Sequence, residues 1–254
     1  MPRGWLKAGA RAVLPVSARR WVESQAQRLT RWPPLGKIDF GDLRRLSPIS
    51  KKFGLDRGLC VDRYYIESFL AEFSTDIRGN VLEVGDDRYT KRFGGDRVIH
   101  SDVLHVEGGQ PNATLMADLS RDPTLPPDKF DCIVCTQTLQ FIYDLRAALR
   151  CLYRILKPTG ILLVTFAGIS QVSRFDMERW GDYWRLTTLS TRCLFDEVFP
   201  PENVQINAYG NVLSSVAFLH GIAAEELTQE ELSYHDPDYQ LVIAARVVKP
   251  AATL

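Results

Sequence analysis

The chain has 254 residues, of which 45% are apolar and 24% are charged, as in an ordinary soluble globular protein. This length allows one sizeable α/β domain with appendages. The formal net charge of +0 gives no reason to expect nucleic acid as a partner.

The first element predicted is a basic helix near the N-terminus. Seven Lys or Arg residues stand between Met1 and Trp32, against one acidic residue. Ser17 suits the N-cap, and the prolines after Trp32 end the helix. Because residues 1–54 show no strand pattern, we expect a helical extension there and a domain over 55–254. The basic segment either packs as a solvated helix or makes weak contact with an anionic membrane surface or a synthase partner.

Cysteine use and hydropathy predict a cytoplasmic protein. Arg11 interrupts the apolar stretch near the start that could resemble a secretion signal. No apolar run approaches the ~20 residues needed to span a bilayer. The five cysteines are odd in number and scattered, unlike a secreted disulfide framework. Cys132 and Cys135 lie three apart in "FDCIVCT", which is typical of a buried strand, so we expect core residues rather than a redox pair.

Further along, a helix is predicted over 62–73 with Asp62 as its cap. From Gly79 onward, short apolar runs alternate with helical or loop stretches, as in parallel strands covered on both faces. The runs are "NVLEVG", "DRVIHSD", "ATLMAD", "FDCIVCT" and "GILLVTFAG". A helix over 145–156 precedes the fifth run, and this alternation favours a doubly wound sheet. After a helix near 191–199, two late strands around 203–210 and 239–248 suggest an antiparallel addition.

Ligands of open α/β sheets bind beyond the carboxyl ends of the strands. Asp102, which is 19 residues beyond Glu83, is expected to end the second strand, where a carboxylate can accept the hydroxyls of a ribose. Asp118 follows the third strand and could accept from an exocyclic amine such as adenine N6. Both aspartates could instead be cap or turn residues, and Glu83 could simply organise its loop.

The series "VLEVG", "SD", "MADLS", "FDCIVCTQTLQFIYD", "RILKPTG" and "ILLVT" resembles the class I S-adenosylmethionine-dependent methyltransferases over Gly79–Ala167. The resemblance implies a Rossmann-like methyltransferase fold, with a mostly parallel seven-stranded sheet and an antiparallel last strand. It also implies S-adenosyl-L-methionine as cofactor. The implied cofactor residues are Gly85 and Asp86 near the methionine part, Asp102 at the ribose, Asp118 and Leu119 at the adenine, and Thr136 and Gln137 under the sulfonium, together with Glu83 and Val103.

The segment "GISQVSRFDMERWGDYWRLTT" resembles the region where many such enzymes build their acceptor pocket. The implied substrate residues are Trp180, Tyr183, Trp184 and Arg185, although these aromatic residues could equally cover the core. The catalytic candidates are His105, Gln140, Asp182 and Tyr183, and the sequence does not select one base among them. No pattern in the chain indicates a metal site.

The first loop departs from the family pattern of acid-x-Gly-x-Gly-x-Gly, because Asp87 and Tyr89 replace the second and third glycines. S-adenosylmethionine has no phosphates and does not need a full nest of backbone amides. The stretches "FGLDRGLCVDRYYIESFL" and "RWGDYWRLTT" are similar to bacterial methyltransferase-domain proteins associated with glycosyltransferases. These features imply O-methylation of a small-molecule or sugar/glycan hydroxyl in glycan or secondary-metabolite biosynthesis. The alternative is a non-catalytic, methyltransferase-like binding or scaffold module with a degenerate cofactor loop.

Overall fold

The computed structural model describes residues 15, 18, 33–34, 36–108 and 110–252. The chain divides into two compact units, Met1–Leu46 and Ser47–Leu254. Among its described residues, the first unit has a 3₁₀ turn at Gly41–Leu43. The basic segment that was predicted to form a helix falls, apart from Ala18, outside the described residues.

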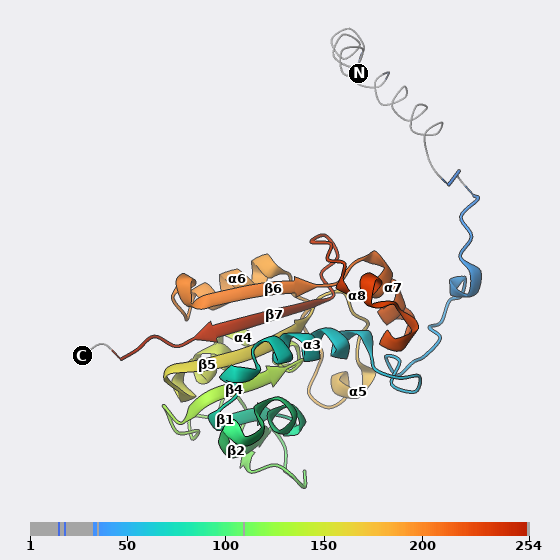
Figure 1. Ribbon diagram of the computed structural model, residues 1–254. Coiled ribbons are helices and arrows are strands. Elements are labelled where there is room, and N and C mark those ends of the chain that lie inside the picture. The colour runs from blue at the N-terminus through green and yellow to red at the C-terminus, as the bar shows by residue number, and fades with distance from the viewer. Residues whose placement is uncertain (1–14, 16–17, 19–32, 35, 109, 253–254) are drawn as a thin grey trace. The chain divides into compact units, whose positions relative to one another are not determined.

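A seven-stranded sheet forms the centre of the second unit (Figure 1), with the strand order β3-β2-β1-β4-β5-β7-β6. The strands are β1 (Gly79–Val84), β2 (Val98–His105), β3 (Leu115–Met116), β4 (Phe130–Thr136), β5 (Leu156–Ala167), β6 (Val204–Tyr209) and β7 (Val242–Val248). The first five strands pair in parallel, and β7 runs antiparallel to both β5 and β6. The predicted doubly wound, mostly parallel sheet with an antiparallel last strand is confirmed.

Helices cover both faces of the sheet, which is why its strands are apolar on both sides. The helices are α3 (Val61–Glu72), α4 (Leu145–Ile155), α5 (Arg174–Met177), α6 (Thr188–Asp196), α7 (Val212–His220) and α8 (Gln229–Ser233). One buried cluster joins α4 and α6 to the sheet, and a second joins α3, α7 and α8 to the other face. Cys132 lies in the second cluster and Cys135 in the first, both as free thiols, so the predicted core cysteines are confirmed.

Two local predictions were wrong. Asp62 does not cap α3, because the N-cap is the extended residue Cys60, which pairs with Ala223 in an isolated bridge. Asp62 lies in the first turn, where its carboxylate accepts from the backbone N–H of Arg63. Asp102 does not end the second strand either, because β2 continues to His105 and Asp102 pairs with Leu82 in its middle.

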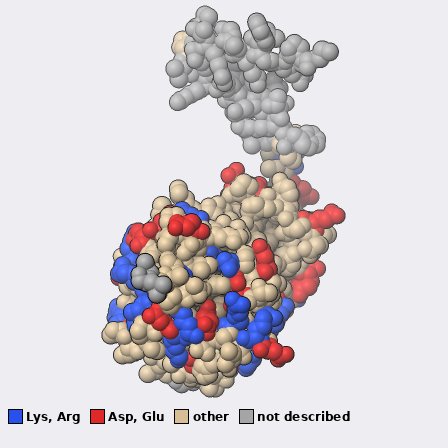
Figure 2. Space-filling model, turned by 60° about the vertical axis from the view of Figure 1, so that its left-hand side comes forward, with Lys and Arg blue, Asp and Glu red and all other residues tan. Residues whose placement is uncertain are grey.

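On the face shown in Figure 2, Lys and Arg side chains alternate with Asp and Glu side chains over the described surface. This mixed pattern agrees with the formal net charge of +0. None of the helices in the described part of the chain is long and apolar enough to cross a membrane.

Candidate functional site

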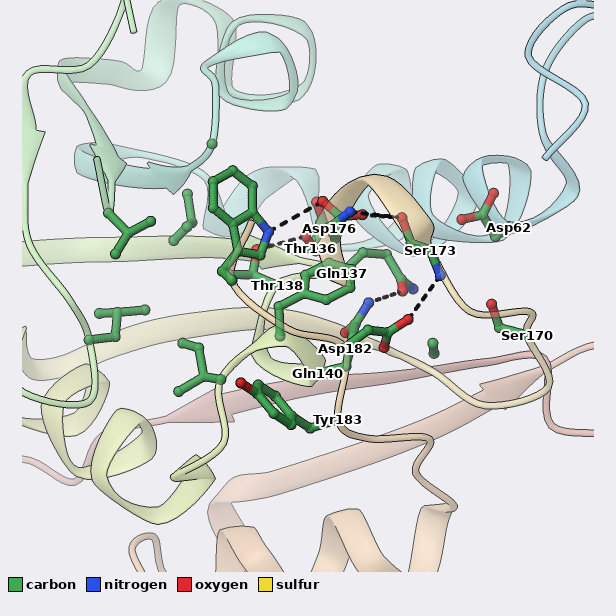
Figure 3. Close-up of a pocket in the computed structure, with 18 of the residues that line it drawn as sticks. Asp62, Thr136, Gln137, Thr138, Gln140, Ser170, Ser173, Asp176, Asp182 and Tyr183 are labelled. Carbon is green, nitrogen blue, oxygen red and sulfur yellow. Dashed lines mark hydrogen bonds between the residues drawn. The ribbon is translucent and has the colours of Figure 1, made fainter. Parts of the chain in front are cut away.

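A cavity of about 660 Å³ opens where the parallel strands end (Figure 3). Its size falls in the range of roughly 300–1,000 Å³ that is typical of small-molecule sites. The strand ends contribute Val84, Gly85, Leu104, His105, Thr136, Gln137 and Ala167. The first turn of α3 and the segment 170–185 supply further walls. The cavity therefore lies at the carboxyl edge of the sheet, where an open α/β fold binds its ligands.

Gly85 keeps the first loop open toward the cavity. Its φ is +99°, a conformation that glycine adopts easily, and its N–H donates to the Leu104 carbonyl over 3.0 Å. A Cβ placed on Gly85 would meet no other atom within 4 Å. The space beside the tip of β1 is thus free for a ligand.

Glu83 organises the loop from below rather than lining the cavity. Its buried carboxylate accepts from the backbone N–H groups of Thr90 over 2.7 Å and of Tyr89 over 3.3 Å. Burial raises the pKa of Glu83 to about 7, against the effect of these hydrogen bonds. Of the two roles considered for Glu83, the geometry matches the structural one.

The residues that replace glycines in this loop turn away from the cavity. Asp86 pairs with Arg88 at 2.7 Å, and Asp87 pairs with Lys91 at 2.6 Å. The Tyr89 ring packs on the α3 side of the sheet, with its centroid 6.0 Å from that of Phe93. Asp86, predicted next to the methionine part of the cofactor, is not among the cavity-lining residues. The bulkier loop leaves the cavity open.

Asp102 lies outside the cavity lining, contrary to its predicted place at the tip of β2. Its carboxylate is 4% exposed and accepts from the Thr114 hydroxyl over 2.7 Å and from Lys129 Nζ over 2.6 Å. Burial acts to raise the pKa of Asp102, but these hydrogen bonds outweigh it and the pKa is lowered. Val103 is buried and also lies outside the lining. Both residues belong to the packing of the sheet.

His105 occupies the tip of β2 instead. Its Nδ1 lies 3.0 Å from the carbonyl oxygen of Glu107, and its ring meets Trp180 edge-on with the centroids 5.8 Å apart. β2 and β4 flank β1, and neighbouring strands are about 4.8 Å apart. His105 therefore lies roughly 10 Å from the tip of β4, on the side of the cavity toward β3.

Asp118 and Leu119, which were predicted to contact adenine, line the cavity beyond β3. Asp118 Oδ1 accepts from both the N–H and the hydroxyl of Ser120, over 2.8 Å and 2.7 Å. The other carboxylate oxygen is 3.8 Å from the exposed Arg121. Asp118 thus forms a turn and still presents a carboxylate edge to the cavity.

Gln140 connects the floor of the cavity to the segment above it. Its Nε2 donates to Gln137 Oε1 over 2.7 Å, and its backbone carbonyl accepts from the N–H groups of Tyr183 and Trp184. Gln137 holds a left-handed φ of +48° at the end of β4. The Gln140 side chain is almost fully buried, yet its Oε1 has no hydrogen-bond partner among the described residues. Unpaired buried acceptors are rare in native structures, and this one belongs to a residue that lines the cavity.

Asp182 and Arg185 tie the segment 170–185 together. The two guanidinium nitrogens of Arg185 donate to the two oxygens of Asp182 over 2.6 Å and 2.9 Å, and the Asp182 side chain is fully buried. Asp182 also accepts from the backbone N–H of Ser173 over 2.9 Å. Burial acts to raise the pKa of Asp182, but the Arg185 and Ser173 contacts lower it overall. Because both oxygens are engaged, Asp182 is a positioning residue rather than a free base.

The aromatic residues of this segment lie at different depths. Trp180 lines the cavity and donates from Nε1 to Asp176 over 3.3 Å. Tyr183 also lines it, with its ring 5.4 Å from the largely exposed Tyr143. Trp184 lies outside the lining, since its Nε1 donates to the Ile142 carbonyl and its ring stacks on Tyr143. Both roles considered for this segment are therefore present: Trp180 and Tyr183 form part of the cavity wall, and Trp184 packs over the core.

Several lining residues were not singled out from the sequence as ligand contacts. They are Asp62 and Arg63 on α3, Tyr143 after β4, and Ser170, Ser173 and Asp176 after β5. The last three lie within the segment that resembles an acceptor pocket, so this resemblance could have indicated them from the sequence. No spacing rule indicates Asp62 and Arg63, because only the packing of α3 brings them to the strand ends.

Comparison with known proteins identifies the central part of this structure. Residues 74–164 match the family model of the methyltransferase domain. Residues 74–164 therefore resemble a methyltransferase domain. No curated protein matches the sequence.

Solved structures agree on the fold. A SAM-dependent methyltransferase from Archaeoglobus fulgidus is 13% identical over 74% of this chain and 94% of its own, with a TM-score of 0.50. Phosphoethanolamine N-methyltransferase 2 from Haemonchus contortus, in complex with S-adenosyl-L-methionine, is 14% identical over 83% of this chain and 55% of its own, with a TM-score of 0.50. At such identities the likeness concerns the fold alone, which is the Rossmann-like methyltransferase fold.

Proposed function

We propose that this methyltransferase domain transfers a methyl group from S-adenosylmethionine to a hydroxyl of a neutral, sugar- or glycan-like small molecule. The observation that carries the proposal is the buried, unpaired Oε1 of Gln140 at the cavity wall. Gln140 lies between the strand ends, where we place the cofactor, and the aromatic segment, where we place the acceptor.

The residues present fit S-adenosylmethionine as cofactor. The open space at Gly85 can accept ligand atoms close to the backbone. Leu104, Ala117 and Leu119 give the β2 and β3 side of the cavity an apolar wall suited to a base, and Asp118 offers an acceptor at its edge. The missing feature is a carboxylate at the tip of β2, where His105 stands.

The acceptor end favours a hydroxyl group over a cationic amine. A hydroxyl can donate its hydrogen bond to Gln140 Oε1. Two carboxylates of the acceptor segment line the cavity, and both are already engaged, Asp182 by Arg185 and Asp176 by Ser173 and Trp180. A cationic acceptor would find the charge of Asp182 neutralised by Arg185 and both oxygens of Asp176 occupied as hydrogen-bond acceptors. Tyr183 and Trp180 provide flat faces of the kind on which a sugar ring can stack. The resemblance to glycosyltransferase-associated proteins supports the same acceptor class.

When bound, S-adenosylmethionine supplies a methyl group on a cationic sulfur. The protein's task is then to hold the acceptor oxygen in line with that group, and positioning of this kind supplies on the order of 7–11 kcal/mol of a barrier. In our proposal, Gln140 orients the hydroxyl from the floor, while Asp182 and Arg185 keep Tyr183 against Gln140. Of the four catalytic candidates, Gln140 and Tyr183 lie together, whereas His105 lies toward the nucleoside side.

The test is incubation of the full chain with methyl-labelled S-adenosylmethionine and fractionated small molecules and glycans from a bacterial extract. The expected result is label in a neutral product that resists the mild base that cleaves methyl esters. Label recovered in amines or in protein would contradict the proposed acceptor class. No transfer to any fraction would contradict the methyltransferase activity.

A second candidate function is that of a non-catalytic binding module. Two observations favour it: the glycine-poor loop, and Asp102 held within the sheet by Lys129. A module that binds no methyl donor would give no saturable heat with S-adenosylhomocysteine, whereas the enzyme requires it. This titration separates the two candidates without knowledge of the acceptor.

We also propose that the protein works in the cytoplasm and that its basic N-terminal segment makes weak contact with an anionic membrane surface or a synthase partner. Free thiols at all five cysteines support the first proposal, and the charge of residues 1–32 supports the second. Sedimentation with anionic vesicles should capture the full chain more strongly than a version starting at Gly36. Equal capture would remove the membrane contact.

A further inference from the structure

Two charged side chains in the first turn of α3 line the cavity and have no part in the acceptor chemistry. They are Asp62, drawn in Figure 3, and Arg63. Their nearest charged atoms, Arg63 Nε and Asp62 Oδ2, are 4.0 Å apart, so the pair is loose. The cavity thus offers a cation and an anion side by side.

Arg63 is also linked to the altered loop. Burial acts to lower the pKa of Arg63, but the charge of Asp62 and the nearby Tyr89 side chain outweigh it and the pKa is raised. Tyr89 is held at its backbone by Glu83 and at its ring by the cluster on the α3 side of the sheet. The residue that replaces a glycine therefore lies near the guanidinium at the cavity.

The amino-acid end of S-adenosylmethionine is a zwitterion with one carboxylate and one ammonium. A planar guanidinium suits a carboxylate because it can donate two parallel hydrogen bonds. A neighbouring carboxylate suits an ammonium. The partial positive charge at the start of α3, a helix of 12 residues, adds to the attraction for an anion.

We propose that Arg63 binds the carboxylate of the cofactor's amino-acid end, while Asp62 receives its ammonium. A side-chain clamp from α3 then replaces the backbone cradle that a glycine-rich loop would provide. The inference rests on the proposed function, because it concerns the same cofactor. It explains why a bulky residue is tolerated at position 89.

The test compares two probes by titration calorimetry on the full chain. S-adenosylhomocysteine contains the amino-acid end, and 5′-methylthioadenosine lacks it but keeps the adenosine and the thioether. Arg63→Met should lower the affinity for S-adenosylhomocysteine about 10- to 100-fold, as expected for loss of a charged hydrogen-bonded pair. The affinity for methylthioadenosine should stay within about twofold.

Arg88→Met is the matched control, because Arg88 lies on the same loop, is exposed, pairs with Asp86 and does not line the cavity. It should change neither affinity. If Arg63→Met does not fold, Arg63→Lys serves instead, with an intermediate loss for S-adenosylhomocysteine alone. Equal weakening of both probes, or of neither, overturns the clamp and leaves the proposed function standing. A wild-type chain that binds neither probe overturns both.

Discussion

Replacing Glu83 with Gln should change the pH dependence of stability, because Glu83 is a buried acid under the cofactor loop. Its side chain is 2% exposed, and burial raises its pKa from 4.5 to about 7. The negative charge of Asp86 acts in the same direction. The amide introduced by Glu83→Gln would keep an acceptor oxygen for the loop N–H groups but could not ionise.

The magnitude follows from proton linkage. Between the unfolded pKa of 4.5 and the folded pKa of about 7, the folded chain binds more protons at Glu83 than the unfolded chain does. Wild-type stability therefore falls as the pH rises through this window. Each unit of pKa difference corresponds to about 1.4 kcal/mol, so the loss between pH 5 and pH 8 is about 2.5 kcal/mol. The Glu83→Gln variant lacks this loss.

The assay is urea unfolding of the wild type and Glu83→Gln at several values between pH 5 and pH 8. The difference in free energy of unfolding should shift by about 2.5 kcal/mol in favour of the variant from the lowest to the highest pH. A constant difference across this range would refute the reasoning, since it would mean that Glu83 is already ionised in the folded chain at pH 5. A constant offset that favours the wild type would only report the lost second oxygen.

Three further substitutions probe the site. Asp102→Ala leaves Lys129 without its partner and should cost about 1–3 kcal/mol of stability in urea unfolding, while calorimetry finds S-adenosylhomocysteine affinity within about twofold. A large loss of affinity would place this carboxylate at the ligand after all. Gly85→Ala places a side chain on a residue with a φ of +99° and puts its methyl group in the cavity. It should lower stability by roughly 1–3 kcal/mol and lower the affinity for S-adenosylhomocysteine at least tenfold. Unchanged binding would mean that the ligand lies elsewhere. Gln140→Leu should lower label transfer, measured on the labelled product, more than tenfold. The affinity for S-adenosylhomocysteine, measured by calorimetry, should fall by a smaller factor. An unchanged transfer rate would remove Gln140 from acceptor binding.

The fold was predictable because its strands are buried on both faces, so each is a nearly continuous apolar run between turns. The exceptions have local causes. β3 shrinks to Leu115–Met116, with Met116 largely exposed, since little of the chain packs over that edge. β2 extends beyond Asp102 because Val103 and Leu104 continue the apolar run after it. The sequence predicted that the strand ends at this acidic residue. In the structure the Asp102 carboxylate accepts hydrogen bonds from Lys129 and Thr114, which allows it to lie within the strand.

The cavity was predictable where it depends on strand ends, and much less so elsewhere. Gly85 and Gln137 follow their strands directly, Asp118 lies two residues beyond β3, and all three line the cavity. Arg63 comes from a helix that precedes the sheet in the chain, so its place depends on packing between distant segments. The engagement of Asp182 by Arg185 could not be read from their spacing alone, since it requires the whole segment 170–185 to fold back on itself.

The central claim is that the cavity at the strand ends is the site of the methyl donor. A crystal structure of the full chain grown with S-adenosylhomocysteine tests it most directly. The account predicts one molecule in the cavity lined by Gly85, Asp118 and Gln137, with the Tyr89 ring still packed on the α3 side. Tyr89 turned into the cavity, or the ligand bound outside it, would contradict the account.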